Sequence, residues 1–339
     1  MNIKTVYIEI TNRCNLNCRT CYNRSGLNQS TKEISVEQLE DIINTTARYG
    51  ANRFLFSGGE PSLHSDFHAL LEMTKRYPHA SFGFVTNGTV DDPVWIDYLN
   101  SHDNVTLQIS LDGSNEEHNA LTRGIGNFEK TIAFAKKIHN PKLTPLLKTV
   151  ISKKNLDDVE SFYRLALSVG FTPEIAFIYK SGNGSDGWED KAVSPQEKMK
   201  VLQLVDRLNK ETGAEAYLPR CTSKCPFASH TDNMSICIKA DGSIQPCQSL
   251  YSSEFTLGNA FAFDEAEVLS NLDRLTSIAR KRTTMDYGCQ KCMLNKVCGR
   301  GCMAEAFNLT SDPLGNDDGC MLRKLQLLNF DIKKQQKVY

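Results

Sequence analysis

The sequence predicts an α/β fold whose parallel strands form either a barrel or an open sheet, followed by a smaller Cys-rich region. Three observations support this prediction. Predicted strands and helices alternate six times between residues 5 and 212. Polar motifs occur where the first four strands end. The 12 cysteines of the 339-residue chain form two groups, three within residues 14–21 and nine within residues 221–320.

Apolar periodicity defines the six strand–helix units. We expect strands at residues 5–10, 53–57, 81–86, 105–111, 146–151 and 174–179, and helices at 36–49, 66–77, 93–100, 128–139, 157–169 and 195–212. Parallel strands joined by right-handed crossovers place their ligand site at the carboxyl ends of the strands. Four motifs are therefore expected on one rim: Cys14, Ser-Gly-Gly-Glu-Pro at 57–61, Thr-Asn-Gly at 86–88 and Ser-Leu-Asp-Gly at 110–113.

The alternation stops after residue 211. The Gly-rich segment 180–190 is expected to be a loop at the same rim that could cover a substrate. A hairpin is expected at 234–247, around the turn 240–243, and an amphipathic basic helix at 321–334. We divide the chain into residues 1–215 for the strand–helix domain, 216–322 for a Cys-rich domain with the hairpin and short helices, and 323–339 for a closing helix.

Composition excludes some classes of partner. The chain has 39 Lys and Arg against 40 Asp and Glu, a formal net charge of −1, so no overall basic field favours nucleic acid. The start of the sequence lacks the pattern of a signal peptide, and no apolar run approaches the length of a membrane span. We expect a cytoplasmic protein with no membrane or nucleic-acid partner, in which clustered thiols serve metal or redox chemistry.

The front cysteines offer three ligands within eight residues: Cys14, Cys18 and Cys21. Three thiolates satisfy three corners of a cubane iron–sulfur cluster, which leaves one iron open. Spacing alone also allows a zinc site with a distant fourth ligand, or free thiols.

The C-x3-C-x2-C loop and the Gly-Gly-Glu-Pro motif at 58–61 resemble those of the radical S-adenosylmethionine (radical SAM) superfamily. The resemblance implies a partial (β/α)6 TIM-like barrel and S-adenosylmethionine (SAM) bound through its amino and carboxylate groups to the open iron. One electron from the cluster would then cleave SAM to a 5′-deoxyadenosyl radical, which abstracts hydrogen from a substrate.

The resemblance also implies which side chains contact SAM. Gly58, Gly59, Glu60 and Pro61 would hold the methionine amino group. The ribose and carboxylate would lie near Asn87, Ser110 and Asp112, and Arg123 could pair with the carboxylate. The chain departs from the family at Thr20, where an aromatic residue usually precedes the third cysteine. We assign no adenine contact to the adjacent Tyr22.

The rear cysteines resemble the SPASM domain, the auxiliary-cluster extension of many radical SAM enzymes. The resemblance implies one 4Fe–4S cluster on Cys289, Cys292, Cys298 and Cys320. It implies a second on Cys221, Cys225, Cys247 and Cys302, which gives three 4Fe–4S clusters in all. If Cys221 is not a ligand, the second cluster has an open iron.

Paired zinc ribbons are the alternative for this region. Cys237 alternates with Ile236 and Ile238, so we expect a packed thiol rather than a ligand.

Three redox centres favour a net oxidation, such as a carbon–carbon or carbon–sulfur cross-link. The resemblance points to a ribosomally synthesised peptide as substrate and to an electron donor such as flavodoxin or ferredoxin. Leader recognition is expected from a separate protein or from the barrel face.

Gln248 follows Cys247, at the position where sulfatase maturases carry an Asp, which counts against sulfatase maturation. A small-molecule tailoring enzyme, on an aminoglycoside-like or haem-pathway substrate, is the first alternative. A non-catalytic iron–sulfur or zinc protein is the second. No catalytic base is identified, and Tyr179, Glu189 and Asp190 are interpreted as ordinary residues of the rim.

Overall fold

The computed structural model describes residues 1–26, 31–218, 225–228, 234–285 and 287–329. Its strands form one nine-stranded sheet in the order β6-β5-β4-β3-β2-β1-β7-β8-β9. The strands are β1 (Ile3–Thr11), β2 (Arg53–Gly58), β3 (Ser81–Thr86), β4 (Val105–Ser110), β5 (Leu146–Ile151), β6 (Thr172–Phe177), β7 (Met234–Ile238), β8 (Ser243–Gln245) and β9 (Gly258–Asn259). Strands β1 to β6 are parallel and neighbour one another in sequence order, which confirms the six predicted strand–helix units.

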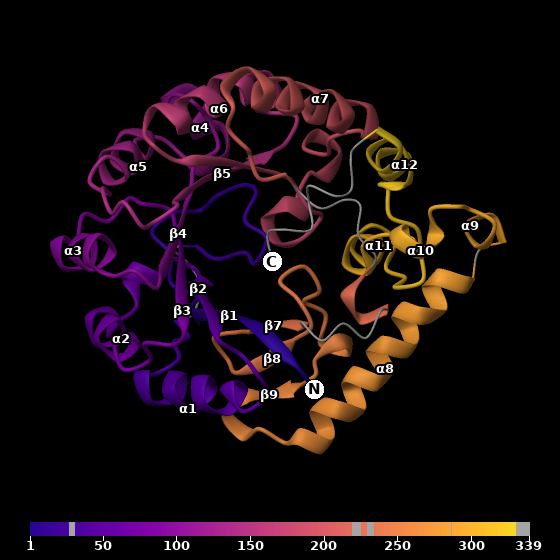
Figure 1. Cartoon of the computed structure of the whole chain (residues 1–339), viewed down its shortest axis with the longest axis horizontal. Coiled ribbons are helices and arrows are strands. Elements are labelled where there is room, and N and C mark those ends of the chain that lie inside the picture. Colours follow the sequence, from indigo (N-terminus) through magenta and orange to yellow (C-terminus); the bar gives the residue numbers. More distant parts are fainter. Residues whose placement is uncertain (27–30, 219–224, 229–233, 286, 330–339) are drawn as a thin grey trace.

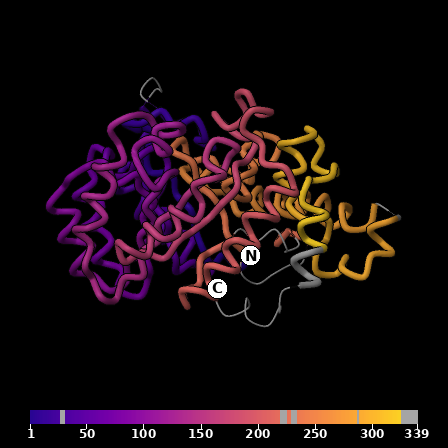
Figure 2. The backbone as a smooth tube through the Cα atoms, turned by 90° about the horizontal axis from the view of Figure 1, so that it is seen from above, coloured from indigo at the N-terminus to yellow at the C-terminus, as the bar shows by residue number. Residues whose placement is uncertain are grey.

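Seven helices of the strand–helix part lie outside the curved sheet, and the Cys-rich segment lies across the open side of the ring (Figure 1). The first group is α1 (Val36–Ala47), α2 (Phe67–Thr74), α3 (Pro93–Ser101), α4 (Glu116–Arg123), α5 (Phe128–Ala135), α6 (Val159–Ser168) and α7 (Pro195–Thr212). The second group is α8 (Glu265–Thr284), α9 (Tyr287–Gln290), α10 (Asn295–Cys298), α11 (Met303–Thr310) and α12 (Cys320–Asn329). Seen from above, the two parts occupy the two ends of an elongated molecule (Figure 2). No helix in the described ranges has both the length and the apolar character needed to cross a membrane.

Local sequence explains where the principal helices begin. Ser35 caps α1 in a reciprocal pair with Gln38, and Ser194 caps α7 in the same way with Glu197. Pro195 occupies the first turn of α7, where its missing N–H costs no hydrogen bond. Helix α7 therefore has the bounds that the sequence predicts.

The expected hairpin forms, but it also extends the main sheet. Strand β7 pairs antiparallel with β8 and parallel with β1, in a register that sets Tyr7 opposite Cys237. The predicted boundary at residue 215 therefore separates two segments whose strands belong to the same sheet. Two helices were not predicted, the short polar α4 and the 20-residue α8.

The core between sheet and helices is rich in aromatic side chains. Phe82 on β3 is fully buried and stacks on Phe54 and Phe56 of β2, with ring centroids 5.7 and 5.8 Å away. On β1, Val6, Ile8 and Ile10 are fully buried in this core. Tyr7 and Glu9, which alternate with these residues along β1, therefore face the interior of the ring.

Phe82→Ala is expected to destabilise the protein by about 3–5 kcal/mol, because it removes a buried ring and leaves a cavity between β2 and β3. The urea midpoint should fall without a change in the slope of the transition. Val94→Ala is the control, because Val94 on α3 is 51% exposed and its truncation should change stability by less than about 0.5 kcal/mol. Equal midpoints for the two variants would contradict this account of the core.

Candidate functional site

The loop that carries the three front cysteines is fixed to the end of β2 by backbone hydrogen bonds. The Gly59 N–H donates to the Thr11 carbonyl at 2.7 Å, and the Glu60 N–H donates to the Arg13 carbonyl at 2.8 Å. These bonds place Cys14 beside the Gly-Gly-Glu-Pro motif, on the rim where the sequence predicts both.

The two glycines of this motif are required by close backbone contact. A Cβ on Gly58 would lie 2.1 Å from the Thr11 carbonyl oxygen, and Gly58 has a φ of +122°. A Cβ on Gly59 would lie 2.0 Å from the Arg13 carbonyl oxygen. Both distances are shorter than van der Waals contact, so any side chain here would push the cysteine loop away from β2.

Glu60 and Asn87 join the ends of three strands. The Glu60 carboxylate is buried and accepts hydrogen bonds from the Thr86 hydroxyl and the Asn87 N–H, both at 2.7 Å. The Asn87 side chain donates to the Asn15 side chain at 2.9 Å, within the cysteine loop. Burial raises the pKa of Glu60, and the hydrogen bonds that it accepts partly offset this effect. Pro61 opens the short 3-10 turn that follows, Pro61–Leu63.

Asp112 and Arg123 form a buried ion pair on the same rim. The Arg123 Nε atom lies 3.0 Å from Asp112 Oδ2. Asp112 also accepts from the Thr122 hydroxyl at 2.8 Å and the Val150 N–H at 2.9 Å. Burial alone would lower the pKa of Arg123, but Asp112 and the neighbouring Cys18 raise it overall. The Arg123 guanidinium is thus a permanent positive charge beside the front cysteines.

Thr20, the residue that departs from the family pattern, lies within this network. Its hydroxyl is 3.4 Å from Asp112 Oδ2. Ser110, at the end of β4, is half-buried and pairs in register with Lys148 of β5. All the residues that the sequence predicts for the SAM site therefore lie at the carboxyl ends of β2, β3 and β4 or in the segments that follow them.

The Gly-rich segment 180–190 contacts the cysteine loop. The Asn183 N–H donates to the Cys21 carbonyl at 2.8 Å, and its side chain donates to the Cys18 carbonyl at 2.9 Å. The Ser181 hydroxyl donates to the Tyr22 carbonyl at 2.8 Å. The segment therefore lies at the rim, as predicted, and supports the cysteine loop; that it could also cover a substrate stays a prediction. The rim residues Tyr179, Glu189 and Asp190 are exposed.

The three front thiols lie close enough to influence one another. The pKa of Cys14 is raised to about 12, chiefly by burial, with smaller contributions from Glu60, Cys18 and Cys21 and an opposing one from the Leu16 N–H. Burial also raises the pKa of Cys18 to about 11, although Arg123 opposes the shift. Iron binding therefore requires these thiols to lose protons that the cluster-free protein would keep.

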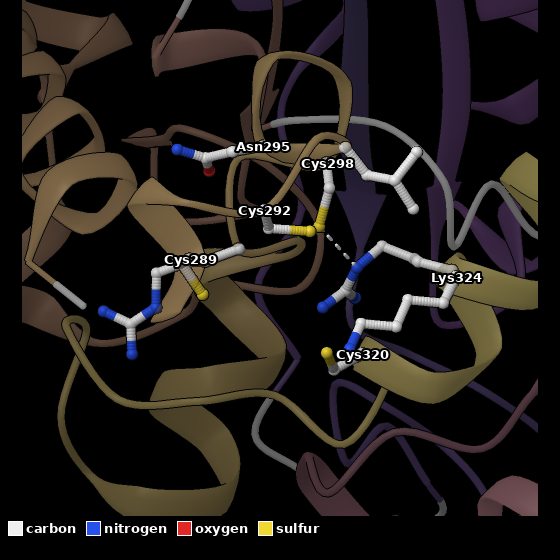
Figure 3. Close-up of a pocket in the computed structure, with 9 residues that line it drawn as sticks. Cys289, Cys292, Asn295, Cys298, Cys320 and Lys324 are labelled. Carbon is white, nitrogen blue, oxygen red and sulfur yellow. Dashed lines mark hydrogen bonds between the residues drawn. The ribbon is translucent and has the colours of Figure 1, made fainter. Parts of the chain in front are cut away.

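Four rear cysteines line a single pocket, which is partly open to solvent. They are the four that the sequence assigns to one cluster: Cys289, Cys292, Cys298 and Cys320 (Figure 3). Arg323 Nε donates to Cys298 Sγ at 3.1 Å, the dashed line in Figure 3. The same guanidinium is held by Asp317 through two hydrogen bonds of 2.6 and 2.7 Å.

A second rear group is formed by Cys225, Cys247 and Cys302. Burial raises the pKa of Cys302, and the charges of Cys247 and Cys225 add to the shift. Burial likewise raises the pKa of Cys247 to about 11, with Cys225 as a neighbour. Cys302 therefore lies near Cys247. It belongs to a different group from Cys298, although only four positions separate the two cysteines in sequence. Cys221, the fourth ligand expected here, lies outside the described residues.

Asp317 connects the two rear groups. Its carboxylate accepts from the Cys302 N–H at 2.9 Å while it holds Arg323, which contacts Cys298. Sequence reasoning missed Asp317 and Arg323, because neither belongs to a cysteine spacing motif.

Cys237 is fully buried on β7, with its Sγ 3.9 Å from the Tyr251 hydroxyl. The sequence predicts it to be a packed thiol outside the cluster ligands. Tyr22 stacks on Tyr251, with ring centroids 5.8 Å apart and planes at 13°. Tyr22 therefore packs against the segment that follows Cys247.

The cysteine groups fit iron–sulfur clusters in donor type. Thiolates are the ligands that such clusters use, and three or four of them meet in each group. Within the described ranges, no three His, Cys, Asp or Glu side chains converge closely enough to hold a single metal ion.

Comparison with known proteins agrees with this geometry. The model of the Radical SAM superfamily matches residues 8–166. The mycofactocin maturase MftC of Mycolicibacterium smegmatis is 29% identical over 323 residues, which cover 92% of this chain and 81% of that protein. The AdoMet-dependent heme synthase of Methanosarcina barkeri is 25% identical, over 93% of this chain and 95% of that protein.

A solved structure has the same fold. Streptococcus suis SuiB bound to S-adenosylmethionine superposes with a TM-score of 0.76 at 17% identity, over 93% of this chain and 76% of SuiB. SuiB bound to its precursor peptide SuiA superposes with a TM-score of 0.74. The sequence match and the shared architecture agree with the cysteine loop and the Gly-Gly-Glu-Pro rim: residues 8–166 form a Radical SAM domain, within a chain that is similar to MftC over 92% of its length.

Proposed function

We propose that this enzyme is a radical SAM/SPASM oxidoreductase that modifies a ribosomally synthesised peptide by a net oxidation, such as a carbon–carbon or carbon–sulfur cross-link. The observation that carries the proposal is the presence of two rear cysteine groups in addition to the front one, with four cysteines round one pocket. A chain that only cleaved SAM would need the front group alone. Further centres can take up the electron that an oxidised substrate loses. The names of MftC, a maturase, and of SuiB with a precursor peptide support a peptide substrate.

The front cluster would be held by Cys14, Cys18 and Cys21 and, when bound, supplies the electron that cleaves SAM. The chain's own residues orient the ligand. The backbone at Gly58, Gly59, Glu60 and Pro61 would face the methionine amino group.

Arg123 would pair with the SAM carboxylate. Asp112 already accepts hydrogen bonds from protein donors at both oxygens, so we assign it to orienting Arg123. Asn87 and Ser110 remain candidates for the ribose.

The rear clusters would be held by Cys289, Cys292, Cys298 and Cys320, and by Cys225, Cys247 and Cys302 together with Cys221. An external donor such as flavodoxin or ferredoxin would reduce the enzyme, and a separate protein could present a leader peptide. A reducing cytoplasm suits so many thiol ligands.

The test is anaerobic incubation of the reduced, reconstituted protein with SAM and with candidate peptides encoded beside its gene. We expect 5′-deoxyadenosine and a peptide lighter by two hydrogens, because one hydrogen leaves as an atom and the other as a proton and an electron. Samples without reductant and samples stripped of iron by chelation are the controls. A colourless protein that holds zinc at its front thiols and forms no 5′-deoxyadenosine would refute the proposal.

A small-molecule substrate is the second candidate function. The heme synthase of Methanosarcina barkeri aligns with nearly the whole of both chains, which favours a haem-pathway reaction as this alternative. Incubation with porphyrin precursors in place of peptides distinguishes the two candidate functions. The true substrate should be consumed in proportion to the 5′-deoxyadenosine that forms.

A further inference from the structure

A buried acidic side chain on β1 faces the interior of the ring. Glu9 is 5% exposed, between Ile8 and Ile10, which are fully buried on the opposite, helix-covered face. In the parallel register Glu9 lies opposite Ser57 of β2, one residue before the Gly-Gly-Glu-Pro motif. The carboxylate is therefore placed at the inner side of the rim that carries the proposed SAM site.

Two tyrosines and a thiol surround this carboxylate. The Tyr251 hydroxyl donates a hydrogen bond to Glu9 Oε1. The Tyr22 ring stacks on Tyr251, and the Tyr22 hydroxyl is buried without a hydrogen bond of standard geometry among the described residues. Cys237 Sγ lies 3.9 Å from the Tyr251 hydroxyl. We call Glu9, Tyr22, Cys237 and Tyr251 the Glu9 cluster.

The Glu9 cluster connects the front cysteine loop to the first rear group. Tyr22 directly follows Cys21, and Tyr251 is four residues beyond Cys247. Asn23 reinforces the connection, because its side chain accepts from the Cys21 thiol at 3.0 Å and donates to the Gly58 carbonyl at 2.9 Å. A substrate radical formed beside SAM would therefore lie near these groups.

No partner neutralises Glu9 by direct contact. In the described part of the chain, no Lys, Arg or His nitrogen lies within 4.0 Å of its carboxylate. Lys239 is 5.0 Å from the centre of the Tyr251 ring and lowers the pKa of Glu9, whereas Asp241 raises it. Burial outweighs the other effects, so the pKa of Glu9 is raised overall. A buried carboxyl without a cation costs stability, which favours a functional reason for its presence.

Three other carboxylates of the interior and rim are already engaged. Glu60 and Asp112 accept from several protein donors. Glu174 of β6 is paired with Lys148 at 2.8 Å. Of these groups, Glu9 is the one whose carboxylate accepts a hydrogen bond from a tyrosine hydroxyl, which can itself pass on a proton.

We propose that Glu9, acting through Tyr251, accepts the proton that the substrate loses when its radical is oxidised. This proposal rests on the proposed function. One hydrogen atom leaves the substrate for the 5′-deoxyadenosyl radical and ends in 5′-deoxyadenosine. The substrate radical would pass one proton to the Tyr251 oxygen and one electron to an oxidised iron–sulfur cluster, which the rear cysteines would hold. Tyr251 releases its own proton to the Glu9 carboxylate, and the substrate has lost two hydrogens in all.

The test compares Glu9→Gln and Tyr251→Phe with the wild-type holoenzyme, using a deuterated peptide. SAM cleavage and deuterium transfer into 5′-deoxyadenosine should stay within about twofold, because hydrogen abstraction precedes proton loss. Product formed per 5′-deoxyadenosine should fall at least 10-fold in both variants, and Glu9→Asp should restore part of it. Glu160→Gln, on the exposed face of α6, is the control and should match wild type.

An unchanged ratio of product to 5′-deoxyadenosine in Glu9→Gln would overturn the assignment of Glu9, even though the enzyme remains a radical SAM oxidoreductase. Absence of 5′-deoxyadenosine in the wild type would instead overturn the proposed function. If Glu9→Gln fails to fold, Tyr251→Phe decides, because it removes one hydroxyl and keeps the stacked ring.

An infrared titration gives a readout that is independent of turnover. The holoenzyme should show a protonated carboxyl band that disappears as the pH rises and that Glu9→Gln lacks. The hydrogen bond from Tyr251 lowers the pKa of Glu9, so Tyr251→Phe should move the midpoint to higher pH. The groups facing Glu9 that could alter the titration are Tyr22, Cys237, Lys239, Asp241 and Tyr251. A midpoint that Tyr251→Phe leaves unmoved would contradict the coupling of the two residues.

Discussion

Cys18→Ala should abolish SAM cleavage and remove about a third of the iron, the share of one cubane among three. Cys18 has no substitute, because Cys14 and Cys21 are the other two thiols of the loop. Two thiolates would leave two irons of a cubane without protein ligands. The measurements are iron and sulfide content and the yield of 5′-deoxyadenosine after reduction.

Cys237→Ala is the matched control for Cys18→Ala. It removes a thiol that is more deeply buried than Cys18 but is not predicted to bind iron. Its iron content should equal that of the wild type. An equal loss of iron in both variants would mean that Cys237 also binds iron. The set of eleven cysteines predicted as cluster ligands would then be incomplete.

Gly59→Ala should prevent stable assembly of the front cluster without changing any ligand. The new Cβ would lie 2.0 Å from the Arg13 carbonyl oxygen, and the opposing atom is backbone that cannot rotate away. The loop from Asn12 to Cys14 must then shift, and the hydrogen bond from Glu60 to Arg13 is lost. We expect a drop in bound iron comparable to that of Cys18→Ala, measured after identical reconstitution.

Gly213→Ala separates this effect from a general cost of replacing glycine. Gly213 ends α7 with a φ of +72°, and nothing lies within 4 Å of its added Cβ. The substitution should cost roughly 1–2 kcal/mol of stability through backbone strain and leave iron binding intact. Full iron content in Gly59→Ala would contradict the close contact between β2 and the cysteine loop.

Most of the strand–helix part could be predicted because its signals are local. Strands β3 and β5 and helix α7 have the bounds expected from apolar runs and caps. Helix α4 was missed because its sequence, Glu-Glu-His-Asn-Ala-Leu-Thr-Arg, has few apolar residues and depends on the Asn115 cap and on packing. The pairing of β7 with β1 was missed because no local pattern encodes contact across more than 220 residues.

The same distinction applies to the site. Cysteine spacing and the Gly-Gly-Glu-Pro motif are short enough to read directly, and the structure brings Cys289, Cys292, Cys298 and Cys320 to one pocket. Glu9 and Tyr251 are 242 positions apart, and each alone resembles an ordinary strand or loop residue. Only the fold brings them together, so sequence reasoning proposed no base. Asp317 and Arg323 escaped notice for the same reason.

The parallel pairing of β7 with β1 means that the two halves of the chain are not interchangeable modules. Five residue pairs join these strands. A fragment cut near residue 215 would leave one side of β1 as a bare edge, a template for aggregation. A chimaera that borrows the Cys-rich half of a relative would have to supply a β7 whose side chains suit the inner face of β1, including Glu9. The pairing of β1 with β7 therefore limits how the Cys-rich half can change as new substrate ranges evolve. The predicted metal ligands impose a second limit.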